Sequence, residues 1–386
     1  MVMQRKLTLA LATSMMMFPQ VVETIYSPAL THIAYGFHVS AEAAAQTLSS
    51  YFFAFALGVV VWGRLCDVIG RRPAILFGLG IYLFASIIAV FGDTFSLLLG
   101  ARVIAAFGAA VGSVGTQTAI RDCFNGQELA QVFSLMGIAM AISPAVGVLS
   151  GTVLTLYWGF QGVFTGLAVL AAILLCYAAW QLPETRPLPR AQNPFLSTFK
   201  RMLKDSDIWR SAVLVALMNI CMFGYYQLAP FHFAALAIPQ QWFGYTGLVL
   251  AIGVGIGAIV NKILVAKNWM FISLLILACG LGLLGGVLML IMENTLWFVL
   301  AMIPVVMAYG IAIPNLLARA LRRYKDCAGT AGAILGLMYY MMLGGGLVLA
   351  GLTQRLSLVL VLSSLLMGLV VLSIVREECG ASTESV

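Results

Sequence analysis

Two charged residues stand in long apolar stretches of this sequence, where a charge is costly. Of the 14 acidic residues, Glu23 lies well inside such a stretch, and Arg102 lies inside another. If these stretches cross a membrane, a buried charge costs roughly 2.5–3.5 kcal/mol, so it needs a partner or a function. A carboxyl group in apolar surroundings can gain and lose a proton. We therefore predict that Glu23 and Arg102 form a proton-coupling pair. Two alternatives remain: a permanent structural ion pair, or an Arg102 side chain that reaches out to the membrane surface.

The composition shows which elements must position these groups. The chain has 386 residues, of which 62% are hydrophobic and 9% charged, whereas soluble domains carry roughly 25% charged residues. A spanning helix needs about 20 apolar residues. The sequence therefore predicts an all-α polytopic membrane protein with 12 transmembrane helices. We expect the spans at residues 7–30, 44–63, 73–91, 95–118, 129–150, 159–181, 211–231, 243–265, 269–291, 296–317, 328–350 and 355–375.

The basic residues predict the orientation in the membrane. Nearly all of them fall on one side of this helix map, including Arg5, Lys6 and Arg376, whereas Arg355 falls on the other side. Because cytoplasmic loops are enriched in Lys and Arg, we expect both termini in the cytoplasm. The net charge of +7 is spread over short loops, so we expect no nucleic-acid partner. The scattered Cys and His residues predict neither a disulfide nor a metal site.

One polar connection divides the chain. Residues 183–210 hold four prolines and six basic residues, and we interpret them as a cytoplasmic linker between an N-terminal bundle, 1–182, and a C-terminal bundle, 211–386. The two bundles share a weak repeat, because Gly63-x-x-x-Asp67 corresponds to Gly257-x-x-x-Asn261. Transporters built from such repeats bind their substrate between the repeats, near the middle of the membrane.

The segment from Gly63 to Arg72 carries a specific motif. It reads Gly-x-Leu-x-Asp-x-x-Gly-Arg-Arg and is followed by Pro73. We expect a tight turn here, with Pro73 in the first position of the next helix. The motif resembles the loop between the second and third helices of major facilitator superfamily transporters. That resemblance implies two pseudo-symmetric six-helix bundles. It also implies that Asp67 meets the start of the eleventh span, near residues 328–330.

Three further segments resemble parts of the same family. Leu98, Arg102 and Gly108 follow the spacing of a fourth-helix motif. Ser143, Pro144 and Gly147 are similar to the antiporter motif of the fifth helix, with Ser143 in place of a glycine. Residues 23–30 resemble the first helix of the bicyclomycin- and chloramphenicol-resistance branch, although the acid stands one residue earlier here. We expect conformational gating by Gly63, Asp67, Gly70, Arg71, Arg72, Ser143, Pro144 and Gly147.

These features together predict a proton-coupled efflux carrier for small amphipathic compounds, monomeric in a bacterial inner membrane, without a cofactor. Ten polar or aromatic residues could line the substrate cavity: Tyr26, Gln46, Tyr51, Gln117, Asn219, Tyr225, Tyr226, Gln227, Tyr309 and Asn315. The nearest alternative is a carrier that imports or exports one metabolite or siderophore. A non-transporting sensor would need a sizeable soluble domain. A membrane-bound enzyme would need a cluster of reactive groups, and the sequence has no such cluster.

Overall fold

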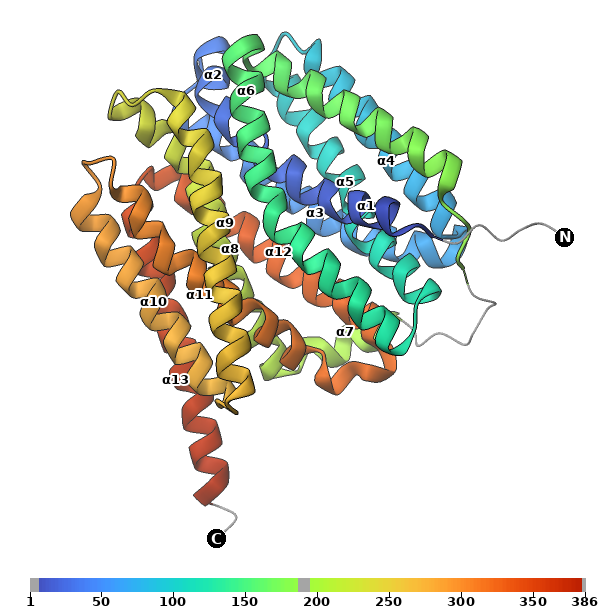
Figure 1. The fold of residues 1–386 in the computed structure, drawn as a ribbon, viewed down its shortest axis with the longest axis vertical. Coiled ribbons are helices and arrows are strands. Elements are labelled where there is room, and N and C mark those ends of the chain that lie inside the picture. The colour runs from blue at the N-terminus through green and yellow to red at the C-terminus, as the bar shows by residue number, and fades with distance from the viewer. Residues whose placement is uncertain (1–6, 187–194, 384–386) are drawn as a thin grey trace, which may run out of the picture.

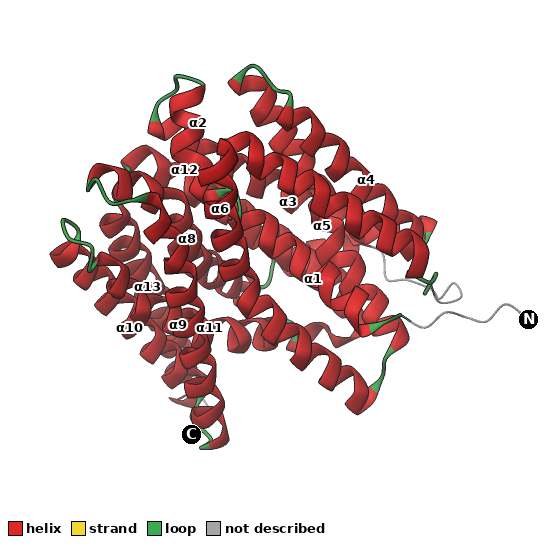
Figure 2. Cartoon of the chain, turned by 45° about the horizontal axis from the view of Figure 1, so that its top comes forward, coloured by secondary structure: helices red, strands yellow, loops and turns green. Residues whose placement is uncertain are grey.

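The computed structural model describes residues 7–186 and 195–383. Within this part the chain is helical almost throughout, with short connecting loops and no strand (Figure 2). Arg5, Lys6 and residues 187–194 of the predicted linker lie outside the described residues. The first half holds α1 (Leu9–Thr24), η1 (Ser27–Ala29), α2 (Leu30–Gly36), α3 (Ala41–Ile69), α4 (Arg71–Val90), α5 (Phe95–Cys123) and α6 (Gly126–Gln181).

The second half repeats this helical organisation. It holds α7 (Phe195–Leu203), α8 (Ser206–Ala235), α9 (Gln240–Ala266), α10 (Phe271–Met292), α11 (Phe298–Ala320), η2 (Arg322–Cys327), α12 (Ala328–Thr353) and α13 (Leu356–Thr383). In Figure 1 the blue-to-green elements and the yellow-to-red elements form two neighbouring bundles. The halves meet mainly where α3 packs on α12 and where α6 packs on α9.

The described helices account for the 12 expected spans. Ten of them are long and apolar enough to cross a membrane. The 56-residue α6 supplies two spans, because the backbone of Gly159 (φ 62°, ψ −161°) leaves the helical conformation in its middle. The remaining span is the first one, made by α1, η1 and α2 together. The limits 1–182, 183–210 and 211–386 stay our proposed boundaries for the bundles and the linker.

The first span is broken rather than continuous over 7–30. Helix α1 ends at Thr24, and a 3-10 turn at Ser27–Ala29 leads into α2. Pro28 has no backbone N–H to donate to the carbonyl of Thr24, so the α-helical pattern cannot continue there. The Thr24 hydroxyl donates to the carbonyl oxygen of Gln20 at 2.9 Å. The break therefore lies directly beside Glu23.

The expected turn over residues 63–72 is much shorter in the structure. Helix α3 continues to Ile69, and Gly70 alone forms the corner, with φ 107°. Gly63 lies inside α3, and Pro73 is the third residue of α4 rather than the first. A positive φ is costly for a residue with a Cβ atom, which explains the glycine at 70. We call the end of the molecule that carries this corner the basic face, and the other end the opposite face.

Part of the predicted linker is helical. Helix α7, Phe195–Leu203, packs against α12 and α8, so it belongs to the second half (Figure 1). Its side chains alternate between buried Thr198 and Met202 and exposed Leu196, Lys200 and Leu203. An amphipathic pattern of this kind is typical of a helix that lies along a surface.

Candidate functional site

Arg102 lies between two aromatic rings in the first half. Its guanidinium carbon is 4.1 Å from the centre of the Tyr26 ring and 4.6 Å from that of Tyr51. The Arg102 side chain is 1% exposed, and its Nε and Nη2 atoms have no hydrogen-bond partner among the described residues. Stacking on aromatic faces stabilises a desolvated cation by about 2 kcal/mol. The alternative of an Arg102 side chain reaching the membrane surface therefore does not apply.

Glu23 lies close to this cation without a direct ion pair. Its side chain is 1% exposed, and its Oε1 atom has no hydrogen-bond partner in the part of the chain that the structure describes. Arg102 is near enough to interact with it electrostatically. The structure thus brings Glu23 and Arg102 to one site, as the sequence suggested, but the Tyr26 and Tyr51 rings take the place of the expected carboxylate contact.

Helices α1, α3 and α5 position this site. The phenol group of Tyr26 donates a hydrogen bond to the Thr47 hydroxyl on α3 at 3.0 Å, which fixes the ring under Arg102. The Thr47 hydroxyl in turn donates to the carbonyl oxygen of Ala44 at 2.6 Å. The broken first span lets the Tyr26 ring turn inward, because this residue stands between α1 and η1.

A cavity of about 640 Å³ lies between the two halves. Its walls are residues 134–144 of α6 and residues 251–259 of α9, with contributions from α1, α8 and α11. Its lining is mostly apolar, with a few polar groups at Gln20, Ser134, Tyr226 and Tyr309. Pockets for small organic ligands have this volume and this mixture of lining groups.

Of the ten residues predicted for the cavity, Tyr226 and Tyr309 line it. The Tyr309 hydroxyl donates to the side-chain oxygen of Asn219 at 3.3 Å. Asn315 instead donates to the side-chain oxygen of Asn261 at 2.7 Å, within the α9–α11 contact. Tyr225 stacks against Phe243, with ring centres 6.1 Å apart. Gln117 is partly buried on α5 and is not among the cavity-lining residues.

Tyr26 and Tyr51 belong to the Arg102 site, and Gln46 and Gln227 hold helices of the two halves together at the opposite face. Further residues that line the cavity were not predicted from the sequence: Gln20, Ser134, Met222 and the small residues Gly137 and Gly255. Their polarity and size are common in membrane helices, so only the helix packing distinguishes them. The sequence did contain one indication: Gln20 stands one helical turn before Glu23, so both side chains lie on the same side of the first span.

The fifth-helix motif lets α6 approach the break in the first span. A Cβ atom on Gly147 would overlap the Thr24 hydroxyl, and one on Gly151 would overlap the carbonyl oxygen of Ile25. Pro144 lines the cavity, and the Ser143 hydroxyl donates to the carbonyl oxygen of Ala139 at 2.7 Å. This segment therefore connects the cavity wall to the backbone beside Glu23.

The Gly70 corner is held by charges of the first half. Arg71 forms ion pairs with Asp67 at 3.1 Å and with Asp122 at 2.8 Å. The Glu184 carboxylate accepts hydrogen bonds from the backbone N–H groups of Arg71 and Arg72, at 2.9 and 3.2 Å. Asp67 thus contacts Arg71, and its expected contact with residues 328–330 stays a prediction. Near them, a Cβ atom on Gly63 would lie 3.8 Å from that of Ala333 on α12.

Residues 9–349 match the sequence model of the Major Facilitator Superfamily. The chain belongs to the major facilitator superfamily. It is 29% identical over 339 residues to a protein of Rickettsia bellii (strain RML369-C) described as an uncharacterized transporter, covering 84% of each chain. It is 26% identical over 336 residues to multidrug resistance protein D of Escherichia coli (strain K12), covering 82% of this chain and 81% of the relative.

The fold of this facilitator is also that of solved transporters. The structure of a D-xylose-proton symporter matches 93% of this chain and 96% of its own length, with a TM-score of 0.74 and 14% sequence identity. As a member of this superfamily, the chain is a multi-pass membrane transporter. Membership of a transporter family sets the enzyme alternative aside.

Proposed function

We propose that this facilitator exports small amphipathic compounds in exchange for protons. The observation that carries the proposal is a buried Glu23 with an unpartnered carboxylate oxygen, beside an arginine held by two aromatic rings. An acid without a fixed partner can take up a proton when the surrounding helices move. The mostly apolar cavity suits an amphipathic substrate. The similarity to a multidrug resistance protein supports the same direction and substrate class.

The proposed cycle uses the two charges as a switch. With Glu23 ionised, its charge is balanced by Arg102, and the cavity between α6 and α9 accepts a substrate. Proton uptake by Glu23 removes that balance and leaves the cation on Tyr26 and Tyr51. A change of charge at the break between α1 and η1 then favours a different packing of α1 on α6. We place this cycle in a bacterial inner membrane with both termini in the cytoplasm.

The direct test replaces Glu23 with Gln, which imitates the protonated acid. In everted vesicles, Glu23→Gln should lower pH-gradient-driven transport at least roughly tenfold, since the proton cycle is blocked. Substrate binding should persist and lose its pH dependence. Glu128→Gln is the matched control, because Glu128 is an exposed acid at the start of α6; it should keep gradient-driven transport. Normal gradient dependence in Glu23→Gln would show that Glu23 is not the proton site.

A panel of compounds separates export from the metabolite alternative. Cells that lack this facilitator should accumulate more of several cationic or neutral amphipathic drugs than cells that carry it. Unchanged accumulation of the whole panel, combined with poor growth on one nutrient or iron source, would instead support a carrier for a single metabolite or siderophore.

A further inference from the structure

Hydrogen bonds between the two halves gather at the opposite face. The Ser27 hydroxyl donates to the carbonyl oxygen of Tyr226, and Gln46 Nε2 donates to that of Val348 at 3.3 Å. The Gln240 amide donates to the carbonyl oxygen of Pro28. The cavity, by contrast, is lined by parts of α6 and α9 that lie nearer the basic face. These polar contacts thus close the opposite face, and the cavity lies between them and the basic face.

Among these residues at the opposite face, Gln227 makes the largest number of hydrogen-bond contacts. It is 0% exposed, and its Nε2 atom lies 2.9 Å from the carbonyl oxygen of Ala45, 3.1 Å from that of Leu347 and 3.3 Å from the Ser49 hydroxyl. One side chain of α8 thus joins α3 of the first half to α12 of the second. Because the three neighbours offer oxygen atoms, the amide must present its NH₂ group to them.

Glycine at position 351 makes room for this contact. A Cβ atom there would lie 3.0 Å from Gln227 Nε2 and 3.2 Å from Gln46 Nε2. The two glutamine side chains therefore approach α12 at the same position, where the glycine has no side chain. Gln227 Oε1 is left without a hydrogen-bond partner among the described residues. A buried acceptor without a partner is costly, so the buried position of this amide depends on the hydrogen bonds of its NH₂ group.

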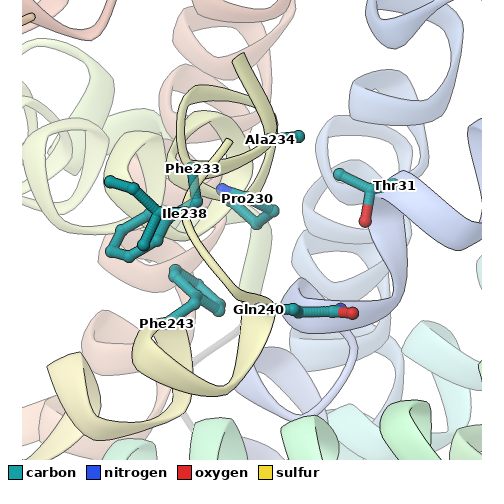
Figure 3. A pocket seen from close by; sticks show the side chains of 7 residues that line it. All are labelled: Thr31, Pro230, Phe233, Ala234, Ile238, Gln240 and Phe243. Carbon is teal, nitrogen blue, oxygen red and sulfur yellow. The ribbon is translucent and has the colours of Figure 1, made fainter. Parts of the chain in front are cut away.

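A second layer lies nearer the surface. Gln240 accepts a hydrogen bond from His32 Nε2 at 2.9 Å, because its own NH₂ group is used by Pro28. Figure 3 shows Gln240 extending from the start of α9 toward the chain segment that carries Thr31, across a small pocket lined by Pro230 and Phe243. The outer layer thus joins the first span to α9, whereas Gln227 joins α3 to α8 and α12.

The same two turns of α3 also hold the charged site. Ala45 and Ser49 accept from Gln227, while Thr47 bonds Tyr26 and Tyr51 covers Arg102. In a helix, residues two apart point to different sides. A rotation or tilt of residues 45–51 would therefore change the Gln227 contacts and the Arg102 contacts together.

We propose that Gln227 is the latch that keeps the opposite face closed, and that residues 45–51 of α3 couple this latch to the Glu23–Arg102 site. Gln227 acts as a positioning residue: it selects which face is open and does not contact the cavity. The coupling to Glu23 rests on the proposed function, whereas the latch itself does not.

Distance measurements between spin labels test the latch without any transport. We would replace the seven native cysteines and attach labels at Tyr35 of α2 and Trp242 of α9, which are 83% and 50% exposed in the two halves. Gln227→Leu removes the donors at nearly constant size. Two net hydrogen bonds are lost, so the population with long label distances should rise roughly tenfold. A second pair at Leu135 and Val265 should show the basic face closing.

In the variant Gln227→Glu, the open population should depend on pH, which a merely structural role would not produce. The ionised carboxylate has no hydrogen to donate to Ala45, Leu347 and Ser49, whereas the protonated acid has one. The open population should therefore rise with pH in Gln227→Glu and stay nearly constant in the parent protein. The hydrogen-bond partners of Gln227 on α3 and α12 are two carbonyl groups and a hydroxyl. The charged groups held by the same segment of α3 are Arg102 and, beside it, Glu23, so the titration of Gln227→Glu is also measured in the Glu23→Gln background. This variant keeps the proposal testable if Gln227→Leu does not fold.

Gln161→Leu is the matched control, since Gln161 is an exposed glutamine of α6 near the same face; it should leave both distances unchanged. Unaltered distances in Gln227→Leu, or an open population in Gln227→Glu that does not depend on pH, would overturn the latch. The coupling is tested by Glu23→Gln alone and combined with Gln227→Leu. If the double variant changes the opening equilibrium by the sum of the two single free-energy changes, the coupling is refuted. The latch and the transport proposal would both still stand.

Discussion

The guanidinium of Arg102 stacks on the ring of Tyr26, with 4.1 Å between the guanidinium carbon and the ring centre. Tyr26 stands at the break between α1 and η1, and Arg102 lies two turns into α5. The cation is thus held by π faces rather than by a carboxylate, which leaves the nearby Glu23 free of a fixed partner. This relationship lets one site hold a buried arginine beside an acid that, in the proposed cycle, changes its charge.

The second aromatic face should contribute measurably to stability. Tyr51→Leu removes the ring that lies 4.6 Å from Arg102, and we expect a loss of about 1–2 kcal/mol, since a desolvated cation–π contact contributes that much. Tyr51→Phe keeps the ring, and the Tyr51 hydroxyl has no partner among the described residues, so its melting temperature should stay near that of the parent. Thermal unfolding in detergent measures both. Equal losses in the two variants would contradict a role for the ring.

The packing of α6 on the break in the first span should depend on a glycine. In Gly151→Ala, the new methyl group would overlap the carbonyl oxygen of Ile25, and overpacking of this kind costs about 1–3 kcal/mol. We expect a lower melting temperature and slower transport, because α1 is displaced beside Glu23. Gly80→Ala serves as the control, since an added Cβ atom there meets nothing within 4 Å. A melting temperature for Gly151→Ala equal to that of Gly80→Ala would contradict this packing.

Filling the cavity should impair substrate binding without unfolding the protein. Gly137 lines the cavity, and a Cβ atom there has nothing within 4 Å. Gly137→Leu should therefore raise KM for transported compounds several-fold, since it removes part of the volume that a ligand would occupy. Its melting temperature should stay close to that of Gly100→Leu, a similarly open position on α5 outside the cavity. An unchanged KM across the compound panel would place the substrate site elsewhere.

The orientation can be tested with a native cysteine. Cys123 is exposed at the end of α5 on the basic face, and the positive-inside rule puts this face in the cytoplasm. A membrane-impermeant thiol reagent should therefore modify Cys123 in inverted vesicles and leave it unmodified in intact cells. Cys123→Ser identifies the labelled site. Rapid modification in intact cells would reverse the proposed orientation.

The sequence by itself determined the class of fold. The hydrophobic content and the length of the apolar stretches predict 12 spans, because a bilayer core of about 30 Å requires helices of about 20 residues. It also identified Glu23 and Arg102 as charged residues inside apolar stretches, where a bilayer disfavours charge. Gly70 could be read as a corner, since a positive φ favours glycine. These conclusions depend on local properties of the chain.

The tertiary structure decided which contacts form between residues that are far apart in the sequence. Ala45 and Leu347 are more than 300 residues apart, and their shared contact with Gln227 has no local signature. The sequence grouped Gln227 with cavity residues because it is a polar residue in an apolar helix. The structure instead directs its donors to backbone carbonyl groups on α3 and α12. Likewise, Tyr26 and Tyr51 became the partners of Arg102 because the break at Ile25 and the packing of α3 bring both rings to it. Side-chain type sets which bonds are available, and only helix packing selects among them.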